Sequence, residues 1–172
     1  MFIKGETIYL RALEPSDAGI LYHWENNMQL WPVSFTQVPF SMFVLEEFVN
    51  AAHQDIYTNK QLRLMACRIH DNKAVGIIDL FEFDPQHVRC GLGIYIDEAE
   101  RKKGYAAEVL RLVQTYAFSV LHLKQLFVHI SAGNEASLAL FQKSGFEKSG
   151  LKKCWQKTGL GKFEDVWFLQ CI

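Results

Sequence analysis

Three consecutive cations, Arg101, Lys102 and Lys103, precede Gly104 where the longest predicted helix, 104–121, begins. The amino end of a helix carries partial positive charge, and each cation placed there costs roughly 0.3–1 kcal/mol. A bound multiply charged anion would remove this conflict, because it would pair with the cations and accept from the free amides. Gly104 has no Cβ and lets a ligand approach the backbone. The pattern predicts an anion site, and a solvated basic turn is the alternative.

Two acids stand in an otherwise apolar predicted strand, 74–83. Alternation along a strand places Asp79 and Glu82 on opposite faces of a sheet. A buried acid without a partner is costly, so Asp79 is expected to contact a substrate or to form an ion pair. Glu82 is expected to contact the substrate, with simple solvation as the alternative.

The glycine patterns of other nucleotide-binding sites are incomplete. A P-loop needs GxxxxGK followed by Ser or Thr, and the run Lys103-Gly104-Tyr105 does not supply it. The run 91–93 lies inside a predicted strand and lacks the third glycine of a dinucleotide-binding turn. Glycines inside a strand instead predict a bulge or a ligand close to the backbone.

Histidine and cysteine residues do not form a metal-binding pattern. Cys67/His70 and His87/Cys90 have the spacing of metal ligands. Residues three apart on a strand face opposite sides, so we expect no metal site. The four cysteines are expected to be buried free thiols: Cys67, Cys90, Cys154 and Cys171. A Cys–His nucleophile pair remains an open alternative without a local signature.

Strands and helices alternate along the rest of the chain. The expected strands are 7–13, 62–69, 74–83, 88–97, 125–130, 146–155 and 163–169, the expected helices are 15–27, 41–57, 104–121 and 134–143, with an aromatic loop at 31–40 and turns at 70–73 and 159–161. Ser41 is the expected N-cap of the second helix, and its apolar stripe is expected to be Phe43, Val44, Phe48 and Ala51. The first four strands should be antiparallel, and the unit 88–130 should form one parallel pair.

Composition places the chain among single compact domains. It has 172 residues, of which 22% are charged, and a formal net charge of −1. This length can bury a core, and the charge balance argues against disorder and against binding nucleic acid by bulk charge. No apolar run reaches the length of a membrane span, and the first residues lack a secretory pattern. We expect one domain, 1–172, in the cytoplasm, without nucleic-acid or membrane partners.

Two motifs resemble those of the GNAT superfamily of acetyltransferases. Arg101-Lys102-Lys103-Gly104-Tyr105-Ala106 is similar to its acyl-CoA pyrophosphate loop, and 134–146 is similar to its second motif. Segments 10–27 and 76–83 look like the branch of bacterial spermidine N-acetyltransferases and, more distantly, of ribosomal-protein N-terminal acetyltransferases. The resemblance implies a mixed α/β fold: a largely antiparallel sheet with a splayed parallel pair, strands four and five, flanked by helices.

The resemblance also implies acetyl-CoA (CoA) as cofactor, bound between the splayed strands. Ile94, Tyr95 and Ile96 would pair with the pantetheine arm through their backbone, as an added strand does. The amides from Arg101 to Ala106 would hold the pyrophosphate. Asn134 would bond the pantetheine amide, with a helix N-cap as the alternative, and Lys143 would lie near the adenosine.

Transfer of acetyl to an amine needs a neutral amine, a polarised carbonyl and a proton for the thiolate. An alkylammonium has a pKa of roughly 10.4, so a base or water relay must accept a proton. A backbone amide in an expected bulge near 94–96 would polarise the carbonyl. Many relatives carry a Tyr that acts as general acid where this chain has Phe141, and the resemblance places Phe141 among the residues that contact the cofactor. Ser137 lies one helical turn earlier, and some relatives contact the cofactor sulfur through a serine at the matching position. The resemblance therefore implies that Ser137 donates to the thiolate, with a small polar helix residue as the alternative.

The acceptor site is the least defined part of the resemblance. It implies contacts from Glu25, Trp31, Asp79 and Glu82, and Asp79 is also predicted to be catalytic. The loop 31–40 is aromatic and lacks the carboxylates of the spermidine enzymes, so it suits a cation, a peptide or an apolar amine. We expect direct acetyl transfer to a small, polyamine-like primary amine. The alternatives are a protein N-terminal acetyltransferase and a non-catalytic acyl-CoA-binding module, and relatives often form homodimers.

Overall fold

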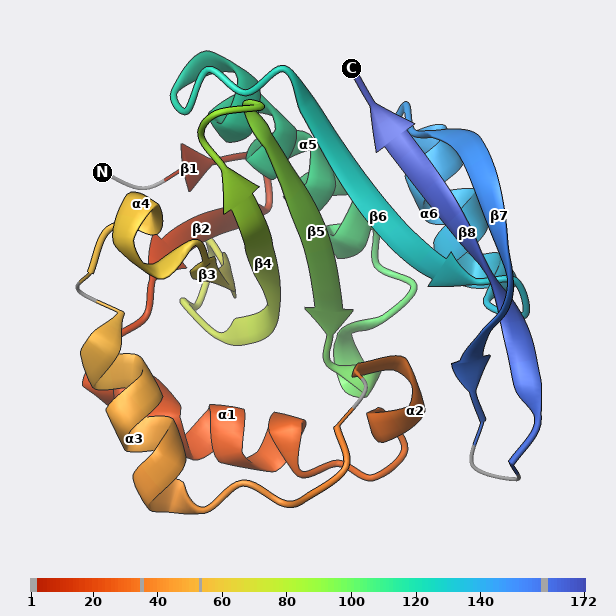
Figure 1. The fold of residues 1–172 in the computed structure, drawn as a ribbon. Helices are drawn as coiled ribbons and strands as arrows, with labels where there is room; N and C mark the ends of the chain where they lie inside the picture. The colour runs from red at the N-terminus through yellow and green to blue at the C-terminus, as the bar shows by residue number, and fades with distance from the viewer. Residues whose placement is uncertain (1–2, 35, 53, 159–160) are drawn as a thin grey trace.

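The computed structural model describes residues 3–34, 36–52, 54–158 and 161–172. Within these ranges an eight-stranded sheet has the order β1-β2-β3-β4-β5-β6-β8-β7 (Figure 1). The strands are β1 (Ile3–Lys4), β2 (Ile8–Ala12), β3 (Leu62–Arg68), β4 (Ala74–Asp84), β5 (Arg89–Ile96), β6 (Gln125–Ser131), β7 (Glu147–Lys157) and β8 (Phe163–Cys171). The α-helices are α1 (Ala18–Glu25), α2 (Trp31–Ser34), α3 (Met42–Ala51), α4 (Ile56–Asn59), α5 (Tyr105–Ser119) and α6 (Glu135–Lys143).

The pairing of the strands confirms the expected mixed topology. From β1 to β5 each neighbouring pair is antiparallel, and β5 and β6 are parallel. Helix α5 connects the two parallel strands, as the sequence predicted. The pairs β6–β8 and β8–β7 are again antiparallel. The turn expected at 159–161 lies largely outside the described residues.

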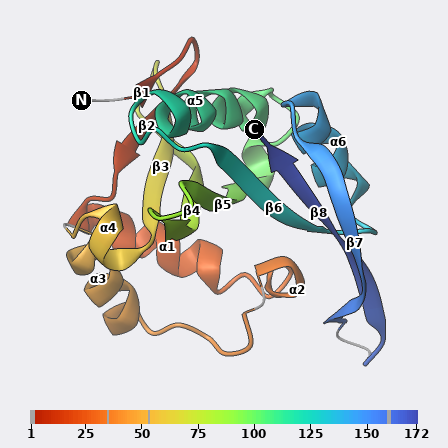
Figure 2. The same ribbon diagram turned by 45° about the horizontal axis from the view of Figure 1, so that its top comes forward.

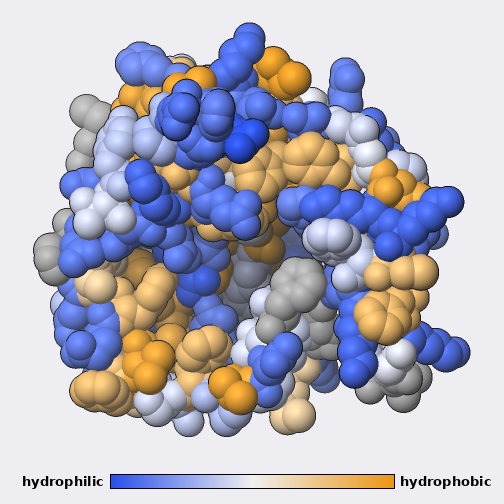
Figure 3. Space-filling view, in the orientation of Figure 1, coloured by the Kyte–Doolittle hydropathy of each residue, from blue (hydrophilic) through white to orange (hydrophobic). Residues whose placement is uncertain are grey.

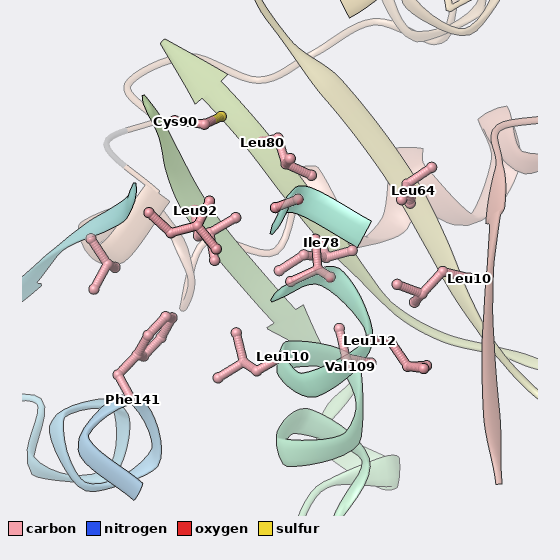
Figure 4. Close-up of a cluster of buried hydrophobic side chains, with 14 of the residues drawn as sticks. Leu10, Leu64, Ile78, Leu80, Cys90, Leu92, Val109, Leu110, Leu112 and Phe141 are labelled. Atoms are coloured by element: carbon pink, nitrogen blue, oxygen red, sulfur yellow. The ribbon is translucent and has the colours of Figure 1, made fainter. Parts of the chain in front are cut away.

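Helices cover the two faces of the sheet unequally. Figures 1 and 2 show α5 and α6 on one face, and α1, α2 and α3 on the other. The larger core packs the sheet against α5, with Ile78, Leu80 and Leu92 facing Val109 and Leu110 (Figure 4). A second cluster lies under α1 and α3 and reaches mainly β3 and β4. No described helix is both long and apolar enough for a membrane span.

The helix predicted over 41–57 is wrong in its extent and in its buried face. Ser41 does cap α3, accepting from the Val44 amide at 3.2 Å. The helical conformation ends after α3, and α4 begins as a separate helix. Asp55 is the N-cap of α4 and accepts hydrogen bonds from two of its backbone amides. The buried side chains of α3 are Leu45 and Val49, one position away from the expected stripe, because packing against α1 sets the rotation of the helix.

Two short elements were not expected from the sequence. Strand β1 pairs with β2 through Ile3↔Leu10 and Lys4↔Tyr9. Helix α2 occupies the start of the predicted aromatic loop. Both are too short for a hydrophobic period to reveal them.

Candidate active site

The anion loop, residues 101–107, consists of the turn before α5 and the first residues of that helix, and a 3-10 turn at Glu98–Glu100 separates it from β5. Gly104 is the N-cap of α5 and has a φ of 84°, a left-handed conformation that glycine adopts without strain. No atom lies within 4 Å of the position that a Cβ would take. The approach to the backbone is therefore open on this side of the loop.

Backbone amides at the start of α5 are available to a ligand. The first i→i−4 hydrogen bond runs from Glu108 N to Gly104 O at 3.2 Å, so the amides of 105–107 precede the helical ladder. The Arg101 amide already donates to Glu98 O at 3.3 Å. The amides that can hold an anion therefore begin at Lys102, one residue later than predicted.

The loop offers fewer cations than the sequence suggests. Lys103 Nζ lies 2.9 Å from Glu100, whose side chain is only 4% exposed. Arg68 and Lys73 bind the same carboxylate from β3 and the following turn. Hydrogen bonds from Lys73 and Lys103 lower the pKa of Glu100 to about 2. This cluster shapes the loop, and Lys102 is the loop cation without a salt bridge in the described part of the chain.

The parallel strands separate soon after they meet. β5 and β6 pair only from Arg89↔Gln125 to Gly91↔Phe127. Beyond that point β6 pairs with β8, and the two strands diverge in Figure 1. The edge of β5 from 92 to 96 therefore faces a gap, and alternate backbone groups of a strand point to each side. This confirms the splayed pair and leaves an edge that an extended ligand can join.

The bulge expected near 94–96 is wrong. The β4–β5 register is regular from Gly76↔Ile96 to Phe81↔Gly91, and the irregularity falls between Phe81 and Asp84. Gly91 has a packing reason instead, since a Cβ there would lie 2.5 Å from the Phe81 ring. The structure gives no bulge at 94–96 from which an amide would polarise a carbonyl.

Helix α6 follows the end of β6, the strand that diverges from β5. Asn134 Oδ1 accepts from the Ser137 amide at 3.1 Å, which confirms the N-cap alternative. The cap uses only the amide oxygen of Asn134, and its Nδ2 remains a donor. Ser137 is half-buried, and its hydroxyl makes no hydrogen bond to the described residues. Lys143, at the end of the helix, is exposed.

Phe141 belongs to the core. It is 2% exposed and packs edge-on against Phe146 at 5.1 Å between ring centroids. Figure 4 shows it pointing from α6 toward Leu92 and Leu110. Its contact with the cofactor stays a prediction, because the ring offers little surface.

An ion-pair cluster gathers predicted acceptor residues on the other face. Arg63 donates to Asp79 from Nε at 2.7 Å and from Nη2 at 2.8 Å, and its Nη1 binds Glu25. The three side chains are 13–17% exposed. Burial lowers the pKa of Arg63, but the two carboxylates outweigh it and hold that pKa above its usual value. The ion pair that the sequence left open for Asp79 is thus formed.

Arg63 is the residue that the sequence analysis missed. It stands directly opposite Asp79 in the β3–β4 register, where opposite charges stabilise a pair. An arginine inside a predicted apolar strand next to an acid in the neighbouring strand was the available signal.

Trp31 and the end of α1 lie in the same region. Trp31 Nε1 donates to the Glu25 carbonyl at 2.9 Å. Trp24 donates to Asp97 at 2.9 Å and packs edge-on against Tyr95 at 5.3 Å. Burial and the nearby Asp97 raise the pKa of Tyr95 to about 12, so this phenol stays protonated. Glu25, Trp31 and Asp79, three of the predicted acceptor residues, therefore lie in one region beside β5.

Glu82 lies apart from those three. It stands in the β4 bulge with a φ of 49° and lines a cavity of about 540 Å³ together with Phe127. Phe81, two residues after Asp79, packs edge-on against the same Phe127 at 6.3 Å. The cavity therefore lies on the face that carries Asp79. The prediction that Asp79 and Glu82 face opposite sides of the sheet is wrong, because the bulge in β4 interrupts the alternation of its side chains.

Cysteine and histidine residues are dispersed over the described part of the chain. In the described ranges no group of three or more His, Cys, Asp or Glu residues could hold a metal ion. Burial raises the pKa of Cys67, and it raises that of Cys90 to about 12, so neither thiol is a ready nucleophile. Cys154 is exposed and Cys171 half-buried, contrary to the expectation for both.

Comparisons with known proteins agree with this geometry. Residues 7–147 match a family model described as an acetyltransferase (GNAT) domain. The chain is 26% identical to a spermidine N(1)-acetyltransferase of Vibrio cholerae, over 82% of this chain and 79% of that protein. It is 28% identical to a putative ribosomal N-acetyltransferase of Bacillus subtilis, over 85% and 81%. A solved Vibrio cholerae spermidine N-acetyltransferase, in complex with CoA and spermine, matches with a TM-score of 0.87 at 23% identity, covering 96% and 95%.

Proposed function

This chain belongs to the GNAT acetyltransferase family, and from that premise we propose that it acetylates the primary amine of a small, polyamine-like acceptor. It is an N-acetyltransferase that uses acetyl-CoA. The acceptor class, the roles of individual residues and self-association are the parts that the proposal adds.

The proposal rests on the junction of the open β5 edge with the amino end of α5. Backbone amides of 102–107 fit a diphosphate, and the edge from 92 to 96 fits an extended amide-containing arm. Lys102 adds charge at the loop, and Arg101 and Tyr105 flank it. Asn134 Nδ2 and Lys143 would bind further along the same ligand. Acetyl-CoA bound there supplies an activated thioester.

Ser137 is proposed as the donor to the leaving sulfur. Its hydroxyl is half-buried at the first turn of α6 and is not used by the described residues. Phe141 has no proton to give, and its ring is held in the core. A thiolate with a pKa near the Cys value of about 8.5 needs only modest help from such a donor.

The Glu25–Arg63–Asp79 cluster is proposed to hold the far end of the acceptor. Two carboxylates and one guanidinium leave one net negative charge in a half-buried place. That charge attracts a second ammonium group, and Trp31 adds an aromatic neighbour. Both oxygens of Asp79 already accept from Arg63, so we assign it a binding role and place proton transfer elsewhere.

The test measures release of free CoA from acetyl-CoA with spermidine, spermine, butylamine, an aminoglycoside and peptides with free amino ends. Turnover of the polyamines with the highest kcat/KM supports the proposal. Turnover of peptides alone would replace it with N-terminal acetylation, and tight acetyl-CoA binding without any turnover would indicate a binding module.

A variant pair tests the acceptor assignment separately. Glu25→Gln should raise KM for spermidine more than for butylamine and leave KM for acetyl-CoA unchanged. The control is Glu46→Gln, an exposed acid on α3. Equal effects of Glu25→Gln on the two amines would refute the charge argument. Self-association stays a prediction, which sedimentation velocity measures.

A further inference from the structure

The cavity beside Glu82 contains groups that the preceding assignments do not use. Its volume is about 540 Å³, and it is lined by Glu82, Asp84, Arg89, Gln125, Phe127, His129, Lys152, Phe168 and Gln170. Phe127 is the last residue of β6 that pairs with β5, and His129 follows it on the same face. The cavity thus adjoins the point where the strands separate. The face drawn in Figure 3 is hollowed near its centre, with polar and apolar residues around the hollow.

Two strand irregularities aim charged side chains at this cavity. The β4 bulge contains Glu82, whose φ of 49° is rare for a residue with a Cβ. The register of β7 on β8 shifts directly after Lys152, where Cys154 has a φ of 48°. Bulges recur beside active sites because they redirect side chains. Both irregularities therefore point to a functional cavity.

Lys152 and His129 form its central contact. Lys152 Nζ lies 2.8 Å from His129 Nε2. An ammonium group only donates, so this Nε2 accepts and the ring is neutral with its proton on Nδ1. Burial, and next the Lys152 charge, lower the pKa of His129, while Glu82 opposes this effect.

Aromatic rings complete the surroundings of the Lys152 ammonium. It lies 4.4 Å from the centroid of Trp155 and 5.8 Å from that of Phe168. The His129 ring packs against Phe127 and Phe168 at 5.8 and 5.1 Å. An imidazole acceptor beside aromatic faces is a site for a primary alkylammonium, and Lys152 supplies one from the chain itself.

The other polar groups of the cavity are paired among themselves. Arg89 binds Asp84 at 3.3 Å, and Gln170 donates to Gln125 at 2.5 Å. Glu82 makes no salt bridge with the described residues. One carboxylate thus remains to receive a cationic ligand.

We infer that this cavity binds the reacting amine of the acceptor, that His129 Nε2 accepts its proton, and that Lys152 occupies the place of the amine until the acceptor enters. The inference rests on the proposed function and adds its missing base. The displaced Lys152 ammonium stays near the bound amine, and its like charge disfavours the ammonium form of the acceptor.

The proposed step balances in atoms and charge. The acceptor ammonium gives one proton to His129, and the amine nitrogen forms the C–N bond with the thioester carbonyl carbon. The C–S bond breaks with its electron pair on sulfur, and the acetylated nitrogen loses its second N–H proton. Ser137 passes its hydroxyl proton to the thiolate and regains the second proton from the nitrogen, and the imidazolium returns its proton to water. The products are one amide, one thiol and one proton.

Kinetics of His129→Gln test the base. We expect kcat to fall roughly 100-fold, the size that general-base catalysis commonly contributes. The acidic limb of the kcat/KM profile should disappear, while the Kd for acetyl-CoA stays unchanged. The matched control is His122→Gln, an exposed histidine after α5. An unchanged kcat and acidic limb in His129→Gln would overturn the inference.

The variant Lys152→Met tests whether Lys152 occupies the place of the acceptor amine. We expect a lower KM for the acceptor and an acidic limb at higher pH, since Lys152 no longer lowers the pKa of His129. A titration with butylamine, followed by the histidine ring signals, needs no turnover. The signal that is absent from His129→Gln belongs to His129. It should shift when butylamine is added to the wild type, and it should shift at a lower butylamine concentration in Lys152→Met.

The two proposals can fail separately. A wild-type enzyme that acetylates no amine refutes the proposed function. The absence of any butylamine-dependent shift of the His129 signal in both proteins refutes the cavity assignment, whatever the turnover.

Discussion

Replacing Arg63 by methionine should destabilise the protein strongly. The change leaves Glu25 and Asp79, each 17% exposed, without their shared cation. Removing one partner of a buried ion pair costs about 3–5 kcal/mol, and the remaining exposure places this case near the lower end, about 3 kcal/mol. For a chain of this size that corresponds to a fall in Tm of about 6–12 °C.

Urea unfolding at pH 7 measures this loss. The control is Arg111→Met, whose side chain is 57% exposed and 3.9 Å from its acidic partner, and which should cost less than about 0.5 kcal/mol. Adding Glu25→Gln and Asp79→Asn to Arg63→Met should restore most of the stability, because no unpaired charge remains. A loss below about 1 kcal/mol, or no recovery in the triple variant, would refute the reasoning.

Three further predictions concern the cofactor site and the contact of Glu108 with the N-terminal segment. Gly104→Glu should abolish acetyl-CoA binding in calorimetry, and an unchanged affinity of this variant would remove the diphosphate assignment. Gly104→Ala should lower the free energy of unfolding by about 1 kcal/mol, because residue 104 has a positive φ. Ser137→Ala should lower kcat several-fold with little change in KM for acetyl-CoA, and the reverse pattern would make it a binding residue. Glu108→Ala should cost about 2 kcal/mol, since Glu108 accepts from the Thr7 amide and hydroxyl. Burial raises the pKa of Glu108, but hydrogen bonds from Thr7 outweigh it and the net shift is downward, so its contribution exists above the unfolded pKa and is lost as pH falls through the folded one. Unfolding between pH 6 and 3 should therefore show a smaller pH dependence in Glu108→Ala than in the wild type.

The ion-pair cluster of Glu100 with Arg68, Lys73 and Lys103 lies beside the anion loop and changes its charge. From the sequence, the three adjacent cations predicted an anion that would pair with them, or else a solvated basic turn. Lys103 is instead neutralised by Glu100, which Arg68 and Lys73 also bind. One carboxylate shared by three cations relieves the conflict with the helix dipole only in part, so we propose that the backbone amides carry the main role in anion binding.

Elements with a clear period were predictable, and their deviations were not. The antiparallel strands, the parallel pair and helices α5 and α6 follow from hydrophobic patterns and caps. The end of α3, the rotation that buries Leu45 and Val49, and the β4 bulge depend on contacts with other elements. Packing decides which of two adjacent sets of side chains faces the core, because the local propensities for the two orientations are nearly equal.

The sequence by itself determined the order of the elements, the glycine turn before α5 and the two motifs at the amino ends of α5 and α6, because these depend on residues close together in the chain. Only the tertiary structure decided that Arg63 joins Glu25 to Asp79, and that Lys152 meets His129. Those contacts join residues 16 to 38 positions apart. Such partners are set by strand register and bulges, which a hydrophobic pattern constrains only to one face and not to one neighbour.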